Sequence, residues 1–151
     1  MTEHSASYII RPVQESDAVR IADLLRQLGY PTPAEEVVLR LRRVSAAAVV
    51  NDAVLVACIE DSAIGWIQVA IVDSLESGPF AEVRGLVVDE AHRGARIGET
   101  LVRAAEAWAR EHGQTRLRVR SNVIRERAHR FYLRLGYEQA KTQAVFVRDL
   151  G

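Results

Sequence analysis

The sequence predicts a mixed α/β fold, and three observations support that prediction. Apolar residues recur at steps of three and four across residues 97–109, which is the spacing of a helix with one buried face. Short runs such as 64–72 and 83–88 are rich in β-branched and apolar residues, as buried strands are. The two patterns follow each other in the order strand, two helices, three strands, helix, strand, helix and two strands, which makes a mixed sheet covered by helices.

The N-terminal part of the chain predicts one strand and two helices. Residues 8–13 alternate loosely between polar and apolar side chains and predict the first strand. A helix that Glu15 or Ser16 can cap ends near Leu28, just before a glycine. A second helix covers about 32–44, with a threonine as its cap and a proline at its first position.

The middle of the chain predicts three strands in succession. Residues 49–59 and 64–72 form a hairpin whose turn is expected at Asp61–Ser62. A polar loop over 73–79 leads to the strand that ends at 83–88. The sheet is therefore expected to have its longest strands in the middle of the sequence.

The C-terminal part predicts two helices and three strands. The helix that starts at 97 ends before Gly113, and a strand follows at 117–119. The arginines at 116, 118 and 120 alternate onto one side of that strand, and we interpret them as a solvated charged face. A fourth helix carries the apolar residues Ala128, Phe131, Tyr132 and Leu135, and two closing strands are expected at 137–139 and 144–147.

Composition limits the class of function. The 151 residues fit one domain, expected over 8–151 after a loose tail at 1–7. Twenty basic and twenty acidic residues give a net charge of zero, so nothing predicts binding to nucleic acid or a membrane. The start lacks the features of a secretion signal, and the single cysteine, Cys58, fits a reducing compartment, so we expect a cytoplasmic protein. The four histidines lack metal-ligand spacing, and no metal is expected.

The stretch from the third strand to the long helix predicts an anion site. The first amides of a helix have no partners inside the helix, and glycines let a bulky phosphate approach the backbone. Gly94 and Gly98 lie in this turn, and Arg93 and Arg96 add positive charge. Physical chemistry alone predicts a pyrophosphate site here, although glycine-containing turns between a strand and a helix are common.

The same stretch resembles the central motif of the Gcn5-related N-acetyltransferase superfamily. That motif is a strand ending in Leu-x-Val, followed by Arg/Gln-x-x-Gly-x-Gly/Ala at the start of a long helix. Here 86–88 reads Leu-Val-Val, Arg93 matches the first position and Gly98 the last, and Gly94 is a frequent filler. The fourth position, normally glycine, is Arg96. Three outcomes are open: a negative φ would let it present its amide, its side chain could reach a phosphate, or it could block the approach.

A second match lies in the C-terminal part. The superfamily often shows Asn-x-x-Ala-x-x-Phe-Tyr-x-x-x-Gly-Phe, and this chain has Ala128, Phe131, Tyr132, Gly136 and Tyr137 at the corresponding places, with Arg125 where the asparagine often stands. The variant is similar to that of a large subset of small bacterial acetyltransferases. The resemblance covers about 8–149, and it implies a sheet that splays open between its fourth and fifth strands, with acetyl-coenzyme A in the opening.

The resemblance implies transfer of an acetyl group from acetyl-coenzyme A to a primary amine of a small molecule or a protein, by direct attack in a ternary complex. An alternative is an inactive coenzyme A-binding regulatory domain, which Arg96 and the missing asparagine favour. Glu82 and Tyr132 argue against that alternative. A Rossmann-type nucleotide-binding domain is set aside because the chain lacks Gly-x-Gly-x-x-Gly.

Roles for individual residues follow from the resemblance. Tyr132 is the expected acid for the leaving thiolate, with a core tyrosine beside Phe131 as the alternative. Glu82 is the expected base, directly or through water, with a solvated or Arg84-paired carboxylate as the alternative. The amide of Val88 would polarise the thioester carbonyl. The expected coenzyme-binding residues are Leu86, Val87, Val88, Arg93, Gly94, Ala95, Arg96, Ile97, Gly98, Glu99, Thr100, Arg125 and Phe131.

The remaining expectations concern the orientation of residues on the strand, a second candidate base, the acceptor and the oligomeric state. Alternation places Glu82, Arg84, Leu86 and Val88 on one face of their strand. His129 is a weaker candidate for the base than Glu82. The acceptor is expected among the first two helices, Tyr30-Pro31 and the loop 73–79, but the sequence does not identify it. The resemblance also admits a homodimer, because many relatives are dimers.

Overall fold

The structure, a computed structural model, describes residues 7–45, 51–121 and 124–151. The chain forms two compact units, Met1–Arg120 and Ser121–Gly151. Expectations for residues 1–6, for the start of the second strand at 49–50 and for His4 lie outside the described residues. The expectation of a single domain over 8–151 stays a prediction.

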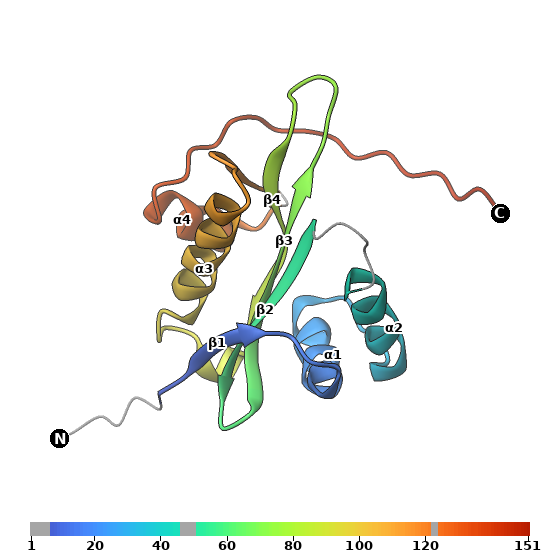
Figure 1. Cartoon of the computed structure of the whole chain (residues 1–151), viewed down its shortest axis with the longest axis vertical. Helices are drawn as coiled ribbons and strands as arrows, with labels where there is room; N and C mark the ends of the chain where they lie inside the picture. Colours follow the sequence, from blue (N-terminus) through green and yellow to red (C-terminus); the bar gives the residue numbers. More distant parts are fainter. Residues whose placement is uncertain (1–6, 46–50, 122–123) are drawn as a thin grey trace. The chain divides into compact units, whose positions relative to one another are not determined.

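The N-terminal unit is built on a five-stranded sheet with the order β1-β2-β3-β4-β5 (Figure 1). The first four strands pair antiparallel, and β4 pairs parallel with β5. Their bounds are Ile9–Pro12 for β1, Asp52–Ile59 for β2, Ser62–Val72 for β3, Phe80–Val88 for β4 and Leu117–Val119 for β5. The mixed α/β prediction is confirmed.

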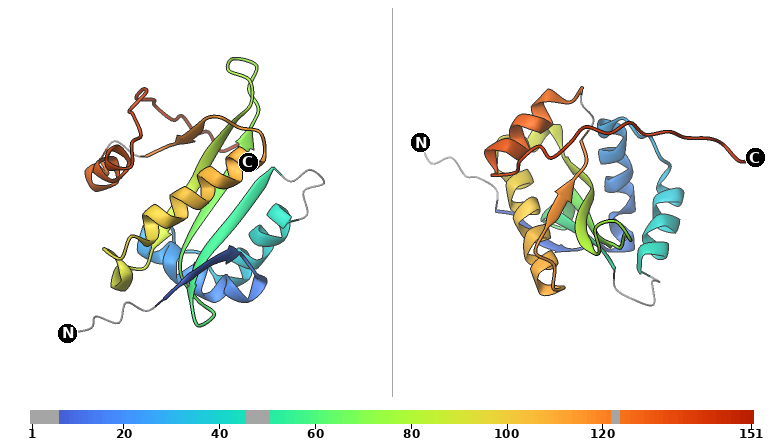
Figure 2. Two further views of the ribbon diagram at one scale, coloured as in Figure 1. Left: turned by 60° about the vertical axis from the view of Figure 1, so that its left-hand side comes forward. Right: turned by 90° about the horizontal axis from the view of Figure 1, so that it is seen from above.

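Three helices cover the two faces of this sheet, as Figures 1 and 2 show. The helix α3 (Ile97–Glu111) lies on one face, and α1 (Ala18–Leu28) and α2 (Ala34–Ser45) lie on the other. The core on the α1 and α2 side joins buried residues of both helices to Val56, Trp66 and Val87 of the sheet. On the α3 side, a Cβ built on Gly65 would lie 3.3 Å from the buried side chain of Leu101.

Two local details differ from the sequence prediction. The β2–β3 hairpin turns at Glu60 and Asp61, which both have positive φ, one residue earlier than expected. The N-cap of α1 is Asp17, not Glu15 or Ser16, and its carboxylate accepts the amide of Gln14 at 2.8 Å rather than an amide of the helix. Both differences shift an element by one or two residues and leave the order of elements unchanged.

The strand β4 contains a bulge. Gln68 of β3 lies opposite Gly85, but the next residue, Val69, lies opposite Val83. Arg84 is therefore an extra residue of β4 that has no residue of β3 opposite it. Because a bulge reverses the alternation of the residues that follow it, the two halves of β4 present opposite sets of side chains to a given face.

The bulge makes one sequence prediction wrong. Ile67 and Val69, two apart on β3, share a face, and their partners Leu86 and Val83 therefore share that face as well. Glu82, next to Val83, then points to the opposite face. Glu82 and Leu86 do not lie on one face, as simple alternation predicts, because the alternation does not account for the extra residue.

The sheet opens between β4 and β5, as expected. The pairing of these strands consists of Ala81 with Leu117, Glu82 with Arg118 and Val83 with Val119. From Arg84 to Val88, the outer edge of β4 has no strand beside it among the described residues. This leaves an open strand edge that leads directly towards the start of α3.

The C-terminal unit contains one described helix, α4 (Glu126–Arg134), followed by residues without regular structure. The prediction of two closing strands at 137–139 and 144–147 is wrong for this structure. The side chains of Val145, Phe146 and Val147 are largely exposed. A strand needs a partner for its backbone hydrogen bonds, and no described residue of this unit forms one.

Candidate active site

The loop between β4 and α3 is fixed to α1 through Asp89. Its carboxylate accepts hydrogen bonds from Arg20 at 3.2 Å and from Gln27 at 3.1 Å, both on α1. Burial raises the pKa of Asp89, but hydrogen bonds from Gln27, the amide of Ala91 and His92, with the charge of Arg20, hold it below its usual value overall. The side-chain oxygen of Gln27 also accepts the amide of Glu90 at 3.0 Å. These contacts tie one end of the predicted anion site to the rest of the unit.

The residues before α3 are exposed, and two of them have left-handed backbone conformations. Gly94 has φ of 88° and Arg96 has φ of 61°. The condition that Arg96 has negative φ is therefore not met. A non-glycine residue pays about 1–2 kcal/mol for this conformation, which explains physically why glycine suits this position. Arg96 is the N-cap of α3, and its side chain forms no capping hydrogen bond with the first turn.

Thr100 closes the first turn of α3. Its amide and its hydroxyl both donate to the carbonyl of Arg96, at 3.0 and 2.9 Å. The hydroxyl also lies 2.8 Å from that of Tyr8, just before β1. Ile97 is buried, whereas 93–96 are exposed. The first turn of α3 is therefore held by the contacts of Thr100, and the residues just ahead of Ile97 are open to solvent.

The open edge of β4 presents backbone groups outward. The amide of Asp89 donates to the carbonyl of Ile64 on β3 at 2.8 Å. Because backbone groups alternate along a strand, Val87 also points to β3, whereas the N–H and C=O groups of Leu86 and Val88 point away from it. An extended ligand lying along this edge can therefore pair with those two residues.

Glu82 lies in a cluster of guanidinium groups. Its side chain is only 2% exposed. One carboxylate oxygen accepts from Arg84 Nη1 at 3.1 Å and lies 3.2 Å from Arg120 Nε. The other accepts from Arg118 Nε and Nη2 at 3.1 and 2.8 Å. Both oxygens are engaged, so Glu82 reaches an amine only through water or after one arginine moves.

This cluster corrects the interpretation of the arginines on β5. Arg118 and Arg120 are partly exposed, as expected, but both are also paired with the buried carboxylate of Glu82, which the sequence did not predict. The guanidinium of Arg118 also lies 4.2 Å from the ring centre of Phe80. The pairing with Arg84 agrees with the alternative considered for Glu82, and its role as the base stays a prediction.

The C-terminal unit holds the other predicted catalytic residue. Tyr132 lies on α4, where its ring meets Phe131 and Tyr137 edge-on, with ring centres 5.1 and 5.9 Å away. Burial raises the pKa of Tyr132 to about 12. Arg125 is the residue before α4, and His129 is half-buried within it. The phenol of Tyr132 therefore stays protonated throughout the neutral range.

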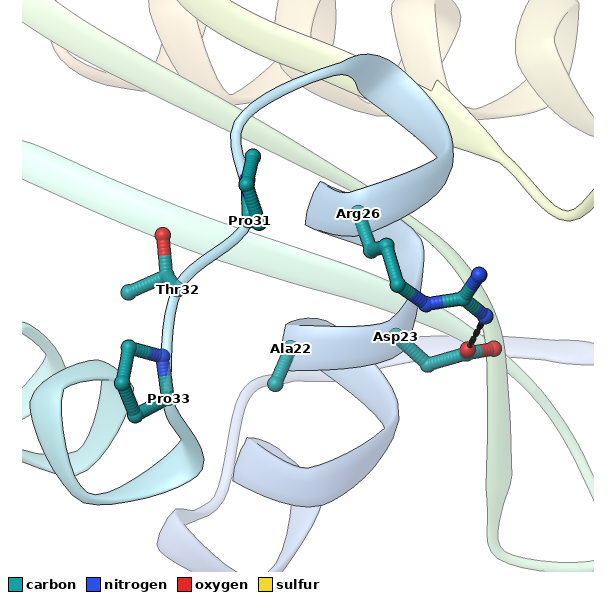
Figure 3. Close-up of a pocket in the computed structure, with 6 residues that line it drawn as sticks. All are labelled: Ala22, Asp23, Arg26, Pro31, Thr32 and Pro33. Atoms are coloured by element: carbon teal, nitrogen blue, oxygen red, sulfur yellow. Dashed lines mark hydrogen bonds and ion pairs between the residues drawn. The ribbon is translucent and has the colours of Figure 1, made fainter.

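A pocket of about 480 Å³ lies between α1 and the connection to α2, as Figure 3 shows. Its one carboxylate, Asp23, is paired with Arg26, and this hydrogen bond is the main reason that the pKa of Asp23 lies below its usual value. The pocket overlaps the expected acceptor region at Pro31. Its lining is Ala22, Asp23, Arg26, Pro31, Thr32 and Pro33.

Other candidate groups carry less chemistry. Cys58 is buried, and burial raises the pKa of its thiol, as expected of a cysteine that fills space rather than reacts. Within 7–45, 51–121 and 124–151, no three His, Cys, Asp or Glu side chains are grouped so that they could hold a metal ion. No described helix has both the length and the apolar character needed to cross a membrane.

The structure divides the predicted site residues into two sets. Leu86–Val88 and 93–100 belong to one continuous strand, loop and helix of the N-terminal unit, whereas Arg125, Phe131 and Tyr132 belong to the C-terminal unit. Sequence reasoning missed Asp89 as the anchor of the loop. It also missed the pairing of Glu82 with Arg118 and Arg120, because that pairing depends on the register of two strands far apart in sequence.

The family model described as the acetyltransferase (GNAT) family matches residues 20–137. The chain belongs to the GNAT acetyltransferase family. This GNAT protein is 29% identical over 142 residues to the aminoglycoside N(6')-acetyltransferase type 1 of Stenotrophomonas maltophilia, covering 91% of this chain and 90% of that one. It is 44% identical over 61 residues to the aminoalkylphosphonate N-acetyltransferase of Salmonella typhimurium, and that match spans 40% of each chain.

Solved structures agree on the fold of this GNAT protein. The aminoglycoside N-acetyltransferase AAC(6')-Iy in complex with CoA superimposes with a TM-score of 0.82 over all of both chains, at 18% sequence identity. At that identity the likeness concerns the fold alone. The named relatives are N-acetyltransferases, whose names refer to aminoglycosides in two cases and to an aminoalkylphosphonate in the third.

Proposed function

We propose that this GNAT protein is an N-acetyltransferase that transfers an acetyl group from acetyl-coenzyme A to a primary amine in a ternary complex. One observation carries the proposal most: the open edge of β4 leads directly to an uncapped, solvent-exposed start of α3. A long ligand could pair an extended arm with the open edge of β4 and place a diphosphate at the start of α3. Family membership adds the reaction class.

The coenzyme would be held by backbone groups on one continuous segment. The outward N–H and C=O groups of Leu86 and Val88 would pair with the pantetheine arm like an added strand. The exposed amides ahead of Ile97 would bind the diphosphate, and Arg93 and Arg96 would add positive charge. Arg96 is exposed and has a left-handed backbone conformation, and its side chain would turn towards the bound diphosphate.

The chemistry needs three groups besides the coenzyme. The amine must lose a proton before it attacks, and Glu82, acting through a water, is our proposed base. A C–N bond then forms as the C–S bond breaks, and the leaving thiolate takes a proton from Tyr132. The raised pKa of Tyr132 keeps its phenol protonated for that step. The amide of Val88 would stabilise the oxyanion, because it points to the open edge.

A second function is favoured by one observation. Glu82 is enclosed by three arginines, and a base that is held so firmly suits a structural role better than proton transfer. The alternative is a regulatory domain that binds coenzyme A without transferring its acetyl group. The departures at Arg96 and Arg125 from the family motif point in the same direction.

Thiol release separates the two functions. The full chain is incubated with acetyl-coenzyme A and single amines, including an aminoglycoside, an aminoalkylphosphonate and simple alkylamines, and free thiol is measured. We expect release that depends on the amine and saturates with its concentration. Tight coenzyme binding by calorimetry without any amine-dependent release would support the regulatory domain. Absence of coenzyme binding would overturn both functions.

A further inference from the structure

The three arginines around Glu82 carry more positive charge than their partner neutralises. Arg84, Arg118 and Arg120, here called the arginine cluster, all pair with this single carboxylate. Guanidinium groups stay charged at any physiological pH, so three positive charges face one negative charge. Among these four side chains, the positive charges therefore exceed the negative charge by two.

The arginine cluster is held in place on one side and open on the other. Glu82 engages one nitrogen of Arg84, two of Arg118 and one of Arg120. Among the described residues, the remaining N–H groups of these three side chains have no acceptor. The side chains are 48%, 34% and 58% exposed, respectively. Fixed guanidinium groups with free donors bind phosphonate, phosphate or carboxylate oxygens at little entropic cost.

The proposed coenzyme site does not account for this charge. The coenzyme diphosphate would bind at the start of α3, and the arm would run from there along Val88 and Leu86 towards Arg84, so the arginine cluster would lie near the thioester end and not at the diphosphate. The bulge also turns Glu82 to the sheet face opposite that of Leu86. A different anion is needed to match the cluster. Its position suits the acceptor, because the open edge of β4 begins at Arg84.

We propose that the acceptor of this enzyme is a small amine that carries a negatively charged group, and that the arginine cluster binds that group. An excess of two positive charges matches a dianionic phosphonate or phosphate best. A polycationic amine is repelled by the same charges. This inference rests on the proposed acetyltransferase function, because it names the substrate class of that reaction.

The test compares matched amines and matched arginine variants. Amine-dependent thiol release is measured with 2-aminoethylphosphonate and with ethanolamine, which has the same chain but no anionic group. We expect kcat/KM for the phosphonate to exceed that for ethanolamine by about tenfold or more. Arg120→Gln should lower kcat/KM for the phosphonate more than for ethanolamine, so that most of the preference is lost through KM. Arg116→Gln is the control, because it removes the same charge beside β5 without a contact to Glu82.

The outcomes that overturn the inference are distinct from failure of the enzyme. Equal kcat/KM for the two amines in the parent protein, or an equal loss for both in Arg120→Gln, would overturn it. If no amine is acetylated, calorimetry with 2-aminoethylphosphonate and coenzyme A decides. Binding that Arg120→Gln weakens and Arg116→Gln does not would keep the arginine cluster as an anion site, and no binding would end the inference. Arg84→Gln replaces Arg120→Gln if the latter unfolds below the assay temperature.

Discussion

At the scale of single residues, Tyr132 combines a defined packing environment with an altered proton affinity. Its ring contacts Phe131 and Tyr137, and burial raises the pKa of its phenol to about 12. Since the protonated form is the one that donates, the acid remains available at every pH below that value. If Tyr132 is the acid, as we propose, we expect loss of activity between pH 6 and 10 to come from another group, and loss from Tyr132 itself only as the pH approaches 12.

We expect Tyr132→Phe to lower kcat by about 100-fold or more, because general acid catalysis typically contributes that much. The affinity for coenzyme A should change little, since phenylalanine keeps the ring and its contacts. Steady-state kinetics gives the first quantity and titration calorimetry gives the second. A variant with the parent's kcat would remove Tyr132 from the acid role, and a variant that lost coenzyme binding would make its role structural.

Some residue-scale features could be predicted from the sequence and others could not. The motif shows that Arg96 replaces a glycine, but only the structure shows that this residue keeps the left-handed backbone that glycine would adopt. Glu82 was recognisable as a carboxylate before a strand end. Its pairing with Arg84 was among the alternatives, but its partners Arg118 and Arg120 were not predictable, because the register of β4 with β5 brings Arg118 to it across 36 positions of sequence.

At the scale of elements, the bulge in β4 determines which side chains face which layer. The extra residue Arg84 sets Glu82 on the face opposite Leu86. Gly85, the next residue, lies directly under the ring of Trp66, where a Cβ would come within 2.8 and 2.9 Å of two ring atoms. Close contact between strand and ring therefore requires glycine at this position.

We expect Gly85→Ala to destabilise the protein by about 1–3 kcal/mol, because the added methyl forces Trp66 from its packed position. Urea unfolding measures this change. Trp66→Leu should remove the clash, so the double variant Gly85→Ala with Trp66→Leu should be more stable than the sum of the two single effects predicts. Additive effects of the two substitutions would show that the methyl group is tolerated without contact with Trp66.

Elements were predictable where their pattern is long and one face is buried. The helix α3 has apolar residues every three or four positions, and it begins at Ile97 as expected. The bulge was not predictable, because one extra residue leaves a run of apolar residues looking like an uninterrupted strand. The closing strands were predicted from Ala144–Val147, but apolar alternation without a partner strand does not fix a strand.

At the scale of the whole molecule, a neutral chain distributes its charges unevenly. Twenty basic and twenty acidic residues cancel overall. Locally, the arginine cluster keeps an excess of positive charge, and Arg93 and Arg96 lie exposed ahead of α3. Net charge therefore excludes little about the ligands of this protein. The two anion-binding regions that we propose suit a coenzyme diphosphate and an anionic acceptor, respectively.

A crystal structure of the full chain with coenzyme A tests the central claim most directly. We predict that diphosphate oxygens lie within about 3 Å of backbone nitrogens between Gly94 and Gly98, with the pantetheine arm along Leu86 to Val88. Coenzyme bound at another surface, or absent from this one at a concentration that saturates the protein in solution, would contradict the account.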